Sequence, residues 1–228
     1  MASIPTRAAN LPAVLAEVLP QLDRLHLFLH GYDDIPEAAR HPKVLPYLAP
    51  KTHEYRASGK FYGLSQEAAP CLYFGFDDDI LYHAGHVDRL VRALRRYRGR
   101  AIVGIHGVRW RSPDATFRTR RRSYFFERGI LLDHQVDLLG TGTVGFVTSE
   151  IPVDPPRWQH GDMDDLFFAI EAERRHLPRL AIARPTRSIA ALDTNQDDSI
   201  WRATTRDDTR QTEQLHILLE LMGKRPSG

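Results

Sequence analysis

Residues 71–79 read CLYFGFDDD, a short apolar run that ends abruptly in three aspartates. An almost uninterrupted apolar run of this length is typical of a strand buried on both faces in a parallel sheet. A helix is predicted after it, because apolar residues recur at helical spacing from Val87 to Leu94. Residues 101–105 then have the composition of another buried strand. This alternation of strand and helix predicts an α/β domain with a mainly parallel sheet.

The periodicity of the remaining chain predicts the other elements. Before the central run we expect a strand at 2–4, a helix at 11–19 capped by Asn10, a strand at 24–30, an irregular stretch at 35–50, a strand at 52–57 and a helix at 60–69. After it we expect a helix beginning near His83, strands at 120–126 and 139–147, a helix at 163–176, a strand at 180–183, a polar loop at 193–208 and a last helix at 212–222.

The amino-acid composition restricts the kinds of protein that this chain can be. The 228 residues are 42% hydrophobic and 26% charged, which suits a single globular domain and argues against disorder throughout. The formal charge of +2 does not indicate nucleic-acid binding by bulk electrostatics. A single cysteine, Cys71, excludes an internal disulfide, and no window approaches the roughly 20 apolar residues that span a bilayer. We therefore expect a soluble cytoplasmic protein.

The aspartate triplet is the main candidate for chemistry. Because side chains alternate along a strand, Asp77 and Asp79 are predicted to share one face while Asp78 points away. The carboxyl end of a buried strand is where open α/β sheets bind ligands, and two carboxylates there offer oxygen ligands to Mg²⁺ or Mn²⁺. The alternative is that one aspartate caps the helix expected near His83 and the others are solvated.

Four further segments lie at the ends of predicted elements, where ligand-binding side chains are commonly placed. They are Pro5-Thr6-Arg7, Gly31-Tyr32-Asp33, Ser58-Gly59-Lys60-Phe61 and Gly161-Asp162-Met163-Asp164-Asp165-Leu166. Each has a plain structural alternative: ordinary turns for the first two, a surface position for Lys60, and helix capping by Asp162. An acid in the last segment is a candidate general base.

Taken in order, these segments resemble the nucleotide-sugar-dependent glycosyltransferases of the GT-A fold, particularly the family-two-like bacterial enzymes. Residues 103–108 and 139–143 also look like parts of such proteins, and the resemblance extends to about Ala183. It implies an α/β GT-A (Rossmann-like) fold, with a mainly parallel central sheet, helices on both faces and a smaller antiparallel addition. It further implies one catalytic domain, comprising a donor-binding half at 1–108, an acceptor-side half at 109–222 and a frayed tail at 223–228.

The resemblance also implies roles for residues. Asp79 would ligate Mn²⁺ or Mg²⁺ between the donor phosphates, and Asp77 would contact the ribose, or the metal through water. The donor pocket would include Pro5, Thr6, Arg7, Asp33, Lys60, Asp77 and Asp78. Asp165 or Asp164 would be the general base of an inverting transfer. Neighbouring helix positions are about 100° apart, so only one of the two would face the site. The resemblance favours Asp165, because the family's base usually sits just before a leucine or similar apolar residue. The register stays open, because the sequence has Met163-Asp164-Asp165 where the family usually has Glu-Asp.

Three weaker candidates would lie on the acceptor side or in a lid: His106, His160 and Trp201. The expected partners are a nucleotide-sugar donor, with UDP the expected nucleotide, and a glycan or lipid-linked acceptor through which the protein would contact the inner face of a membrane. Nucleic acid is not an expected partner. The basic run from Arg118 to Arg122 has three interpretations, namely a solvated hairpin edge, a contact for an anionic acceptor, or a nucleic-acid or membrane surface.

Other functions stay open at this point. A metal-dependent phosphohydrolase usually needs a nucleophilic aspartate after its first strand, where this chain has Ser3-Ile4-Pro5-Thr6. A sugar-phosphate nucleotidylyltransferase usually opens with a glycine-rich phosphate loop, which is also missing. A non-catalytic nucleotide- or glycan-binding module would keep the acidic triplet for its structure.

Overall fold

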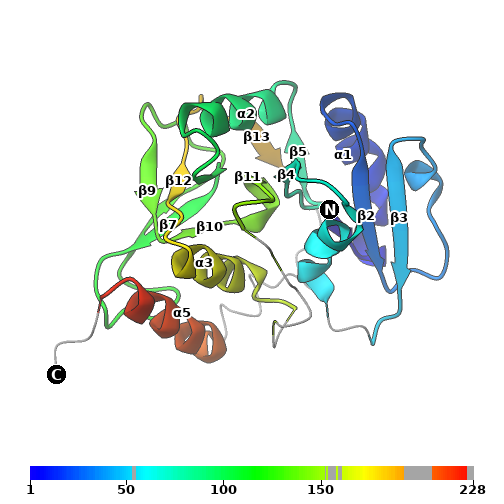
Figure 1. The fold of residues 1–228 in the computed structure, drawn as a ribbon. Helices are drawn as coiled ribbons and strands as arrows, with labels where there is room; N and C mark the ends of the chain where they lie inside the picture. Colours follow the sequence, from blue (N-terminus) through cyan, green and yellow to red (C-terminus); the bar gives the residue numbers. More distant parts are fainter. Residues whose placement is uncertain (53–54, 152, 154–157, 159–160, 193–206, 225–228) are drawn as a thin grey trace.

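The framework is a mixed α/β arrangement in which a small parallel sheet stands beside a larger mixed one (Figure 1). The computed structural model describes the chain except for residues 53–54, 152, 154–157, 159–160, 193–206 and 225–228. The smaller sheet consists of β1 (Ala2–Ser3), β2 (Leu25–His30) and β3 (Val44–Ala49), all parallel. This sheet agrees with the expected parallel arrangement.

The larger sheet has five strands in the order β4, β11, β6, β12, β9. They are β4 (Leu72–Phe74), β11 (Val144–Val147), β6 (Ile102–Gly104), β12 (Arg179–Ala181) and β9 (His134–Val136). Only β6 and β12 pair in parallel, whereas the other three pairs are antiparallel. The expectation of a mainly parallel sheet is therefore wrong for this part of the molecule, because β11 separates β4 from β6 and runs against both.

The run at residues 71–76 forms the edge strand of this sheet instead of a strand buried on both faces. Leu72 is 44% exposed, while Tyr73 is buried. Among the described residues the strand pairs with β11 alone, so one of its sides has no neighbouring strand there.

Two helices cover opposite faces of the five-stranded sheet. Leu90 of α2 (His86–Arg96) shares a core with Val103, and α3 (Asp164–Arg174) lies in a second core with Ile102. Adjacent strand residues point to opposite faces, so the two cores lie on the two sides of β6. The expectation of helices on both faces is confirmed.

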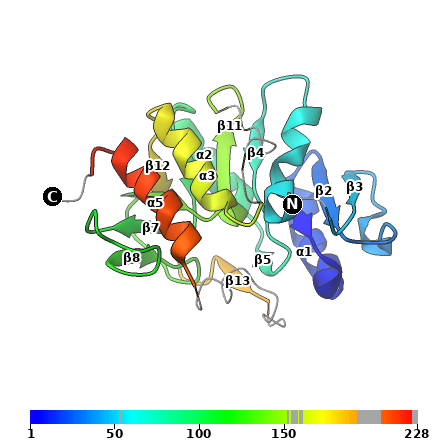
Figure 2. The ribbon, with the colours of Figure 1, turned by 90° about the horizontal axis from the view of Figure 1, so that it is seen from below.

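Smaller elements complete the fold, including the expected antiparallel addition. It consists of two small sheets. One contains β10 (Leu138–Leu139), β7 (Gly107–Trp110) and β8 (Arg121–Tyr124), and the other contains β13 (Ile189–Ala191) and β5 (Ile80–Tyr82). The other helices are α1 (Leu11–Val18) and α5 (Thr209–Leu221), and the 3-10 segments are η1 (Pro5–Asn10), η2 (Leu19–Gln21), η3 (Glu37–Ala39), η4 (Arg56–Gln66) and η5 (Thr141–Thr143). α5 packs along α3 (Figure 2).

Several local expectations are wrong. The stretch 35–50 contains the strand β3, which tolerates Pro46 because it is the edge strand of its sheet. The expected strand at 52–57 and helix at 60–69 give way to η4, which begins at Arg56. The expected strand at 139–147 is divided between β10, η5 and β11. Asn10 does not cap α1 with its side chain, which instead donates to the backbone oxygen of Asp78.

The other expected strands and helices agree closely with the observed ones, whereas β5, β9 and β13 had no predicted counterpart. The expected loop at 193–208 lies almost entirely outside the described residues. No helix in the described part of the chain is long and apolar enough to cross a membrane.

Candidate functional site

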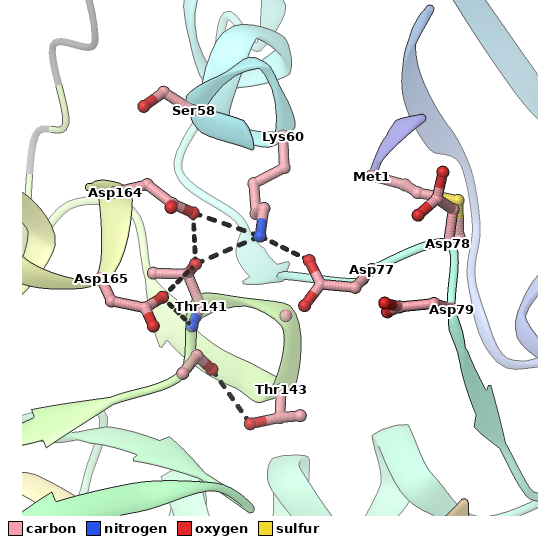
Figure 3. A network of polar contacts seen from close by, with 12 residues as sticks. Met1, Ser58, Lys60, Asp77, Asp78, Asp79, Thr141, Thr143, Asp164 and Asp165 are labelled. Atoms are coloured by element: carbon pink, nitrogen blue, oxygen red, sulfur yellow. Dashed lines mark hydrogen bonds and ion pairs between the residues drawn. The ribbon is translucent and has the colours of Figure 1, made fainter. Parts of the chain in front are cut away.

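Polar side chains from four separate segments meet in one cluster (Figure 3). Lys60 comes from η4 and Thr141 from η5, while Asp164 and Asp165 form the first turn of α3. The aspartates of residues 77–79 follow β4. The cluster therefore unites segments that the sequence analysis had singled out separately.

Lys60 is the centre of the cluster. Its side chain is buried, and its Nζ lies 2.5 Å from Asp77 Oδ1, 3.1 Å from Asp164 Oδ2 and 3.2 Å from Thr141 Oγ1. Burial alone would lower the pKa of Lys60, but the carboxylates of Asp164 and Asp77 outweigh burial and raise the pKa above its usual value. Lys60 is thus a permanently charged internal cation, and its interpretation as a surface lysine is wrong.

Arg7 holds the other two aspartates of the triplet. Its Nη1 lies 3.1 Å from Asp78 Oδ1 and 2.9 Å from Asp79 Oδ2. Asp78 is buried and also accepts a hydrogen bond from the backbone N–H of Ile4 at 3.3 Å. Burial raises the pKa of Asp78 to about 6, although the charge of Arg7 opposes the shift. Asp78 therefore fixes the segment after β1 to the triplet.

The triplet does not belong to a strand, since β4 ends at Phe74. Asp77 points toward Lys60 and Asp78 lies beside Met1 (Figure 3), whereas Asp79 pairs with Arg7. None of the three caps α2, because that helix begins at His86 with Gly85 at its N-cap. The capping alternative for the triplet is wrong.

The pair Asp77 and Asp79 has the ligand chemistry for a divalent cation, with carboxylates that are 35% and 20% exposed. In the part of the chain that the structure describes, no three His, Cys, Asp or Glu side chains are grouped to hold a metal ion. Mg²⁺ is commonly held by one or two carboxylates together with phosphate oxygens and water. The pair therefore offers at most two ligands, to which a phosphate-bearing ligand and water would have to add. Without a cation, Lys60 and Arg7 neutralise the two carboxylates.

Thr141 connects the two acids of α3. Its Oγ1 lies 2.5 Å from Asp164 Oδ2 and 2.7 Å from Asp165 Oδ1, and its backbone N–H donates to Asp165 Oδ1 at 2.8 Å. A hydroxyl carries one proton, so it donates to only one of the two carboxylates. Both acids face the cluster, which corrects the expectation that only one of them would.

The pKa of Asp165 is shifted by its surroundings. Burial and the neighbouring charge of Asp164 raise the pKa of Asp165, against the opposing charge of Lys60. Asp164 forms an ion pair with Lys60 at 3.1 Å. Asp162 does not cap α3, because Met163 is at the N-cap position and Asp162 pairs with Arg210 at 3.7 Å.

The Tyr82 hydroxyl links η5 to the triplet. Asp77 donates its backbone N–H to the Tyr82 hydroxyl at 2.8 Å, and that hydroxyl donates to the backbone oxygen of Gly142 at 2.5 Å. A Cβ added at Gly142 would lie 1.9 Å from Asp77 Oδ2. Glycine is therefore required at position 142 for Asp77 to occupy its present place.

The structure brings the other predicted donor residues near the cluster to different degrees. Pro5 and Thr6 begin η1, directly before Arg7. Asp33 is exposed, and none of the contacts described for the cluster involves it. The turn that carries Asp33 nevertheless lies beside the end of β1, because Tyr32 donates its hydroxyl to the backbone oxygen of Ile4 at 2.9 Å.

His106 borders η5. Its backbone N–H donates to Thr143 Oγ1 at 3.1 Å, and its backbone oxygen accepts from Gly140 N–H at 3.0 Å. Burial and the charge of Arg184 lower the pKa of His106 to about 4, so its ring is neutral at pH 7. His160 and Trp201 lie outside the described residues.

No family model and no curated protein matches this chain. The geometry of the cluster is therefore the basis for a functional assignment. It adds two residues to which sequence reasoning gave no role, Thr141 and Tyr82. The sequence did contain a signal for Thr141, because its segment, residues 140–143, reads GTGT and was one part of the resemblance.

Proposed function

We propose that the protein is a glycosyltransferase that moves a sugar from a nucleoside diphosphate to a hydroxyl of a glycan or lipid-linked acceptor. The supporting observation is the position of Lys60 between Asp77 of the triplet and Asp164 of α3. Through Lys60, the aspartate triplet, which is expected to bind the diphosphate, lies next to the first turn of α3, which carries the expected general base. Transfer needs both functions within one site.

On the donor side, Asp77 and Asp79 would hold Mn²⁺ or Mg²⁺. The cation, when bound, would offset the negative charge that builds on the departing diphosphate. Lys60 and Arg7 add two positive charges at the same place. Both would act on phosphate oxygens, because charged hydrogen bonds to an oxyanion strengthen as its charge develops.

On the acceptor side, Asp165 would be the general base. Both bonds from Thr141 reach Oδ1 of Asp165, which leaves Oδ2 to receive the acceptor proton. The acceptor oxygen would then form a bond to the anomeric carbon as the sugar–phosphate bond breaks and its electrons pass to the diphosphate. Attack opposite the leaving group inverts the anomeric centre. A raised pKa suits the role, because a base works best when its pKa is near the working pH.

We also propose that the fold is a GT-A fold. A GT-A fold is supported by the parallel strands β1 to β3 beside the mixed sheet, with the triplet directly after β4. UDP is the proposed nucleotide, and the cytoplasm is the proposed location.

A donor screen with matched variants tests the proposal. UDP- and GDP-sugars are incubated with the protein, with and without Mn²⁺, and release of the nucleoside diphosphate is measured. We expect release from one donor class with the metal present, its loss in Asp79→Asn, and no change in Asp34→Asn, which alters an exposed aspartate. Metal-dependent stabilisation by UDP without any turnover would instead favour a binding module. Phosphate release from simple esters would favour a phosphohydrolase.

A further inference from the structure

The segment 107–132 has an unusual charge. It contains β7, β8 and the chain that follows them, and it carries seven arginines but only two acidic residues, Asp114 and Glu127, for a net charge of +5. The whole chain has a net charge of only +2. We call this segment the basic hairpin. Its arginines are Arg109, Arg111, Arg118, Arg120, Arg121, Arg122 and Arg128.

Two of these arginines lie directly opposite each other. Arg109 of β7 pairs in register with Arg122 of β8, and both side chains are exposed. Like charges directly opposite each other destabilise a strand pair. Neither arginine has an ion-pair partner among the residues that the structure describes. An external anion would relieve this repulsion.

The same segment also has apolar side chains that are exposed to solvent. Leu131 is 95% exposed, Leu132 71% and Phe125 48%. The backbone that carries them is fixed, because Arg184 Nη2 donates to Phe125 O at 2.8 Å and Ile130 exchanges two backbone hydrogen bonds with Arg184. Their exposure therefore belongs to the folded structure.

Two ring contacts place Arg122 near the exposed leucines. The guanidinium of Arg122 lies over the Tyr124 ring at 4.9 Å, and that ring stacks on His134 at a centroid distance of 4.8 Å. Leu132 is two residues before His134, and two residues span at most about 7 Å. Arg109 and Arg122 therefore lie in the same region of the molecule as Leu131 and Leu132, and all four side chains are exposed.

We infer that this region docks on an anionic lipid bilayer, with the arginines at the phosphates and Leu131 and Leu132 inserted between the headgroups. Basic side chains beside exposed apolar ones are the combination that binds a charged membrane interface. Nucleic acid offers phosphates but no apolar layer for two leucines. The inference does not depend on the proposed reaction, since none of these residues belongs to the Lys60 cluster.

Vesicle sedimentation tests the inference with the full chain. We expect binding to vesicles of mixed phosphatidylglycerol and phosphatidylcholine, weaker binding at high salt, and none to phosphatidylcholine alone. The double variants Arg109→Gln/Arg122→Gln and Leu131→Glu/Leu132→Glu should each lower the partition coefficient at least tenfold. All four side chains are exposed, and thermal melting checks that the variants fold.

Matched controls alter similar side chains elsewhere. Leu48→Glu changes a 48% exposed leucine of β3, which lies at the opposite side of the molecule from β7 and β9 (Figure 1). Arg24→Gln/Arg40→Gln removes two exposed arginines. Neither control should reduce binding. The inference is overturned if anionic vesicles are not bound, if the controls weaken binding equally, or if only the arginine variant does. Preferential binding of single-stranded DNA in a competition would also overturn it.

Discussion

The ammonium group of Lys60 lies between Asp77 and Asp164, 2.5 Å from the first and 3.1 Å from the second. One residue belongs to the segment after β4 and the other to α3, so a single buried cation joins the two parts of the site. With Asp165 nearby, one positive charge faces three acidic groups. Burial and this surplus of negative charge raise the pKa of Asp165.

Replacing Lys60 with methionine should destabilise the protein strongly. The change leaves buried carboxylates without their cation, and breaking a buried ion pair on one side costs about 3–5 kcal/mol. Urea unfolding measures the loss. Arg92→Met is the matched control, because Arg92 pairs with Asp88 where both side chains are 61% exposed, and such pairs contribute at most about 1 kcal/mol. Equal losses for the two variants would contradict the role given to Lys60.

Replacing the two acids of α3 separately should have different effects. Asp165→Asn is expected to lower transfer by about 10²–10⁴-fold, the usual contribution of a general base, while donor binding stays unchanged. Asp164→Asn removes an ion-pair partner of Lys60 and should lower the unfolding free energy more than Asp165→Asn does. Transfer rates, donor titrations and urea unfolding of the two variants distinguish the catalytic role of one acid from the structural role of the other. If Asp164→Asn alone abolishes transfer and keeps its stability, the base is Asp164.

Gly142→Ala should impair the site through Asp77. The added methyl group would overlap Asp77 Oδ2, so the carboxylate must move. Donor turnover should fall by about 10²-fold, as expected for a displacement of about 1 Å. In an Asp77→Ala background the same change should have a much smaller effect, because the overlap is gone. Additive effects of the two substitutions would show that the overlap is not the cause.

His86 should make the stability of the protein depend on pH. Burial, with a smaller effect of the Arg89 charge, lowers the pKa of His86 from 6.5 to about 3. The unfolded chain therefore binds more protons than the folded one in this interval. His86 contributes stability fully above pH 6.5 and loses it as the pH falls toward 3, by up to about 5 kcal/mol.

His86→Phe should flatten this dependence, since the ring packs near Phe76 and Tyr82 and phenylalanine does not titrate. Urea unfolding between pH 4 and pH 7 measures the slope. His83→Gln is the control, because His83 is exposed. A slope that survives His86→Phe would assign the effect to other groups.

The sequence was most informative where local pattern decides the structure. Alternation and helical spacing located β2, β6 and α3, and the end of the apolar run located the triplet. Pairing directions were not predictable, because β11 enters the sheet between β4 and β6 from a distant part of the chain. β3 was missed because Pro46 is usually a sign of irregular chain, and only its edge position makes it acceptable.

The site was predictable as a set of segments but not as a set of contacts. Lys60 was identified as a candidate, whereas its burial depends on residues 77 and 164, which a single sequence does not place beside it. Thr141 lies in a segment that formed part of the resemblance, but a threonine between glycines is equally typical of a turn, so its contacts could not be predicted. Its contacts with α3 arise only from the tertiary fold.

Tyr82 has a consequence for how the chain can be divided. It belongs to β5, whose only partner strand in the described structure is β13 at Ile189–Ala191. The hydroxyl that joins Asp77 to Gly142 is thus supported from a point late in the chain. A fragment truncated before residue 189 would leave β5 unpaired, so the first 108 residues should not behave as a separable module.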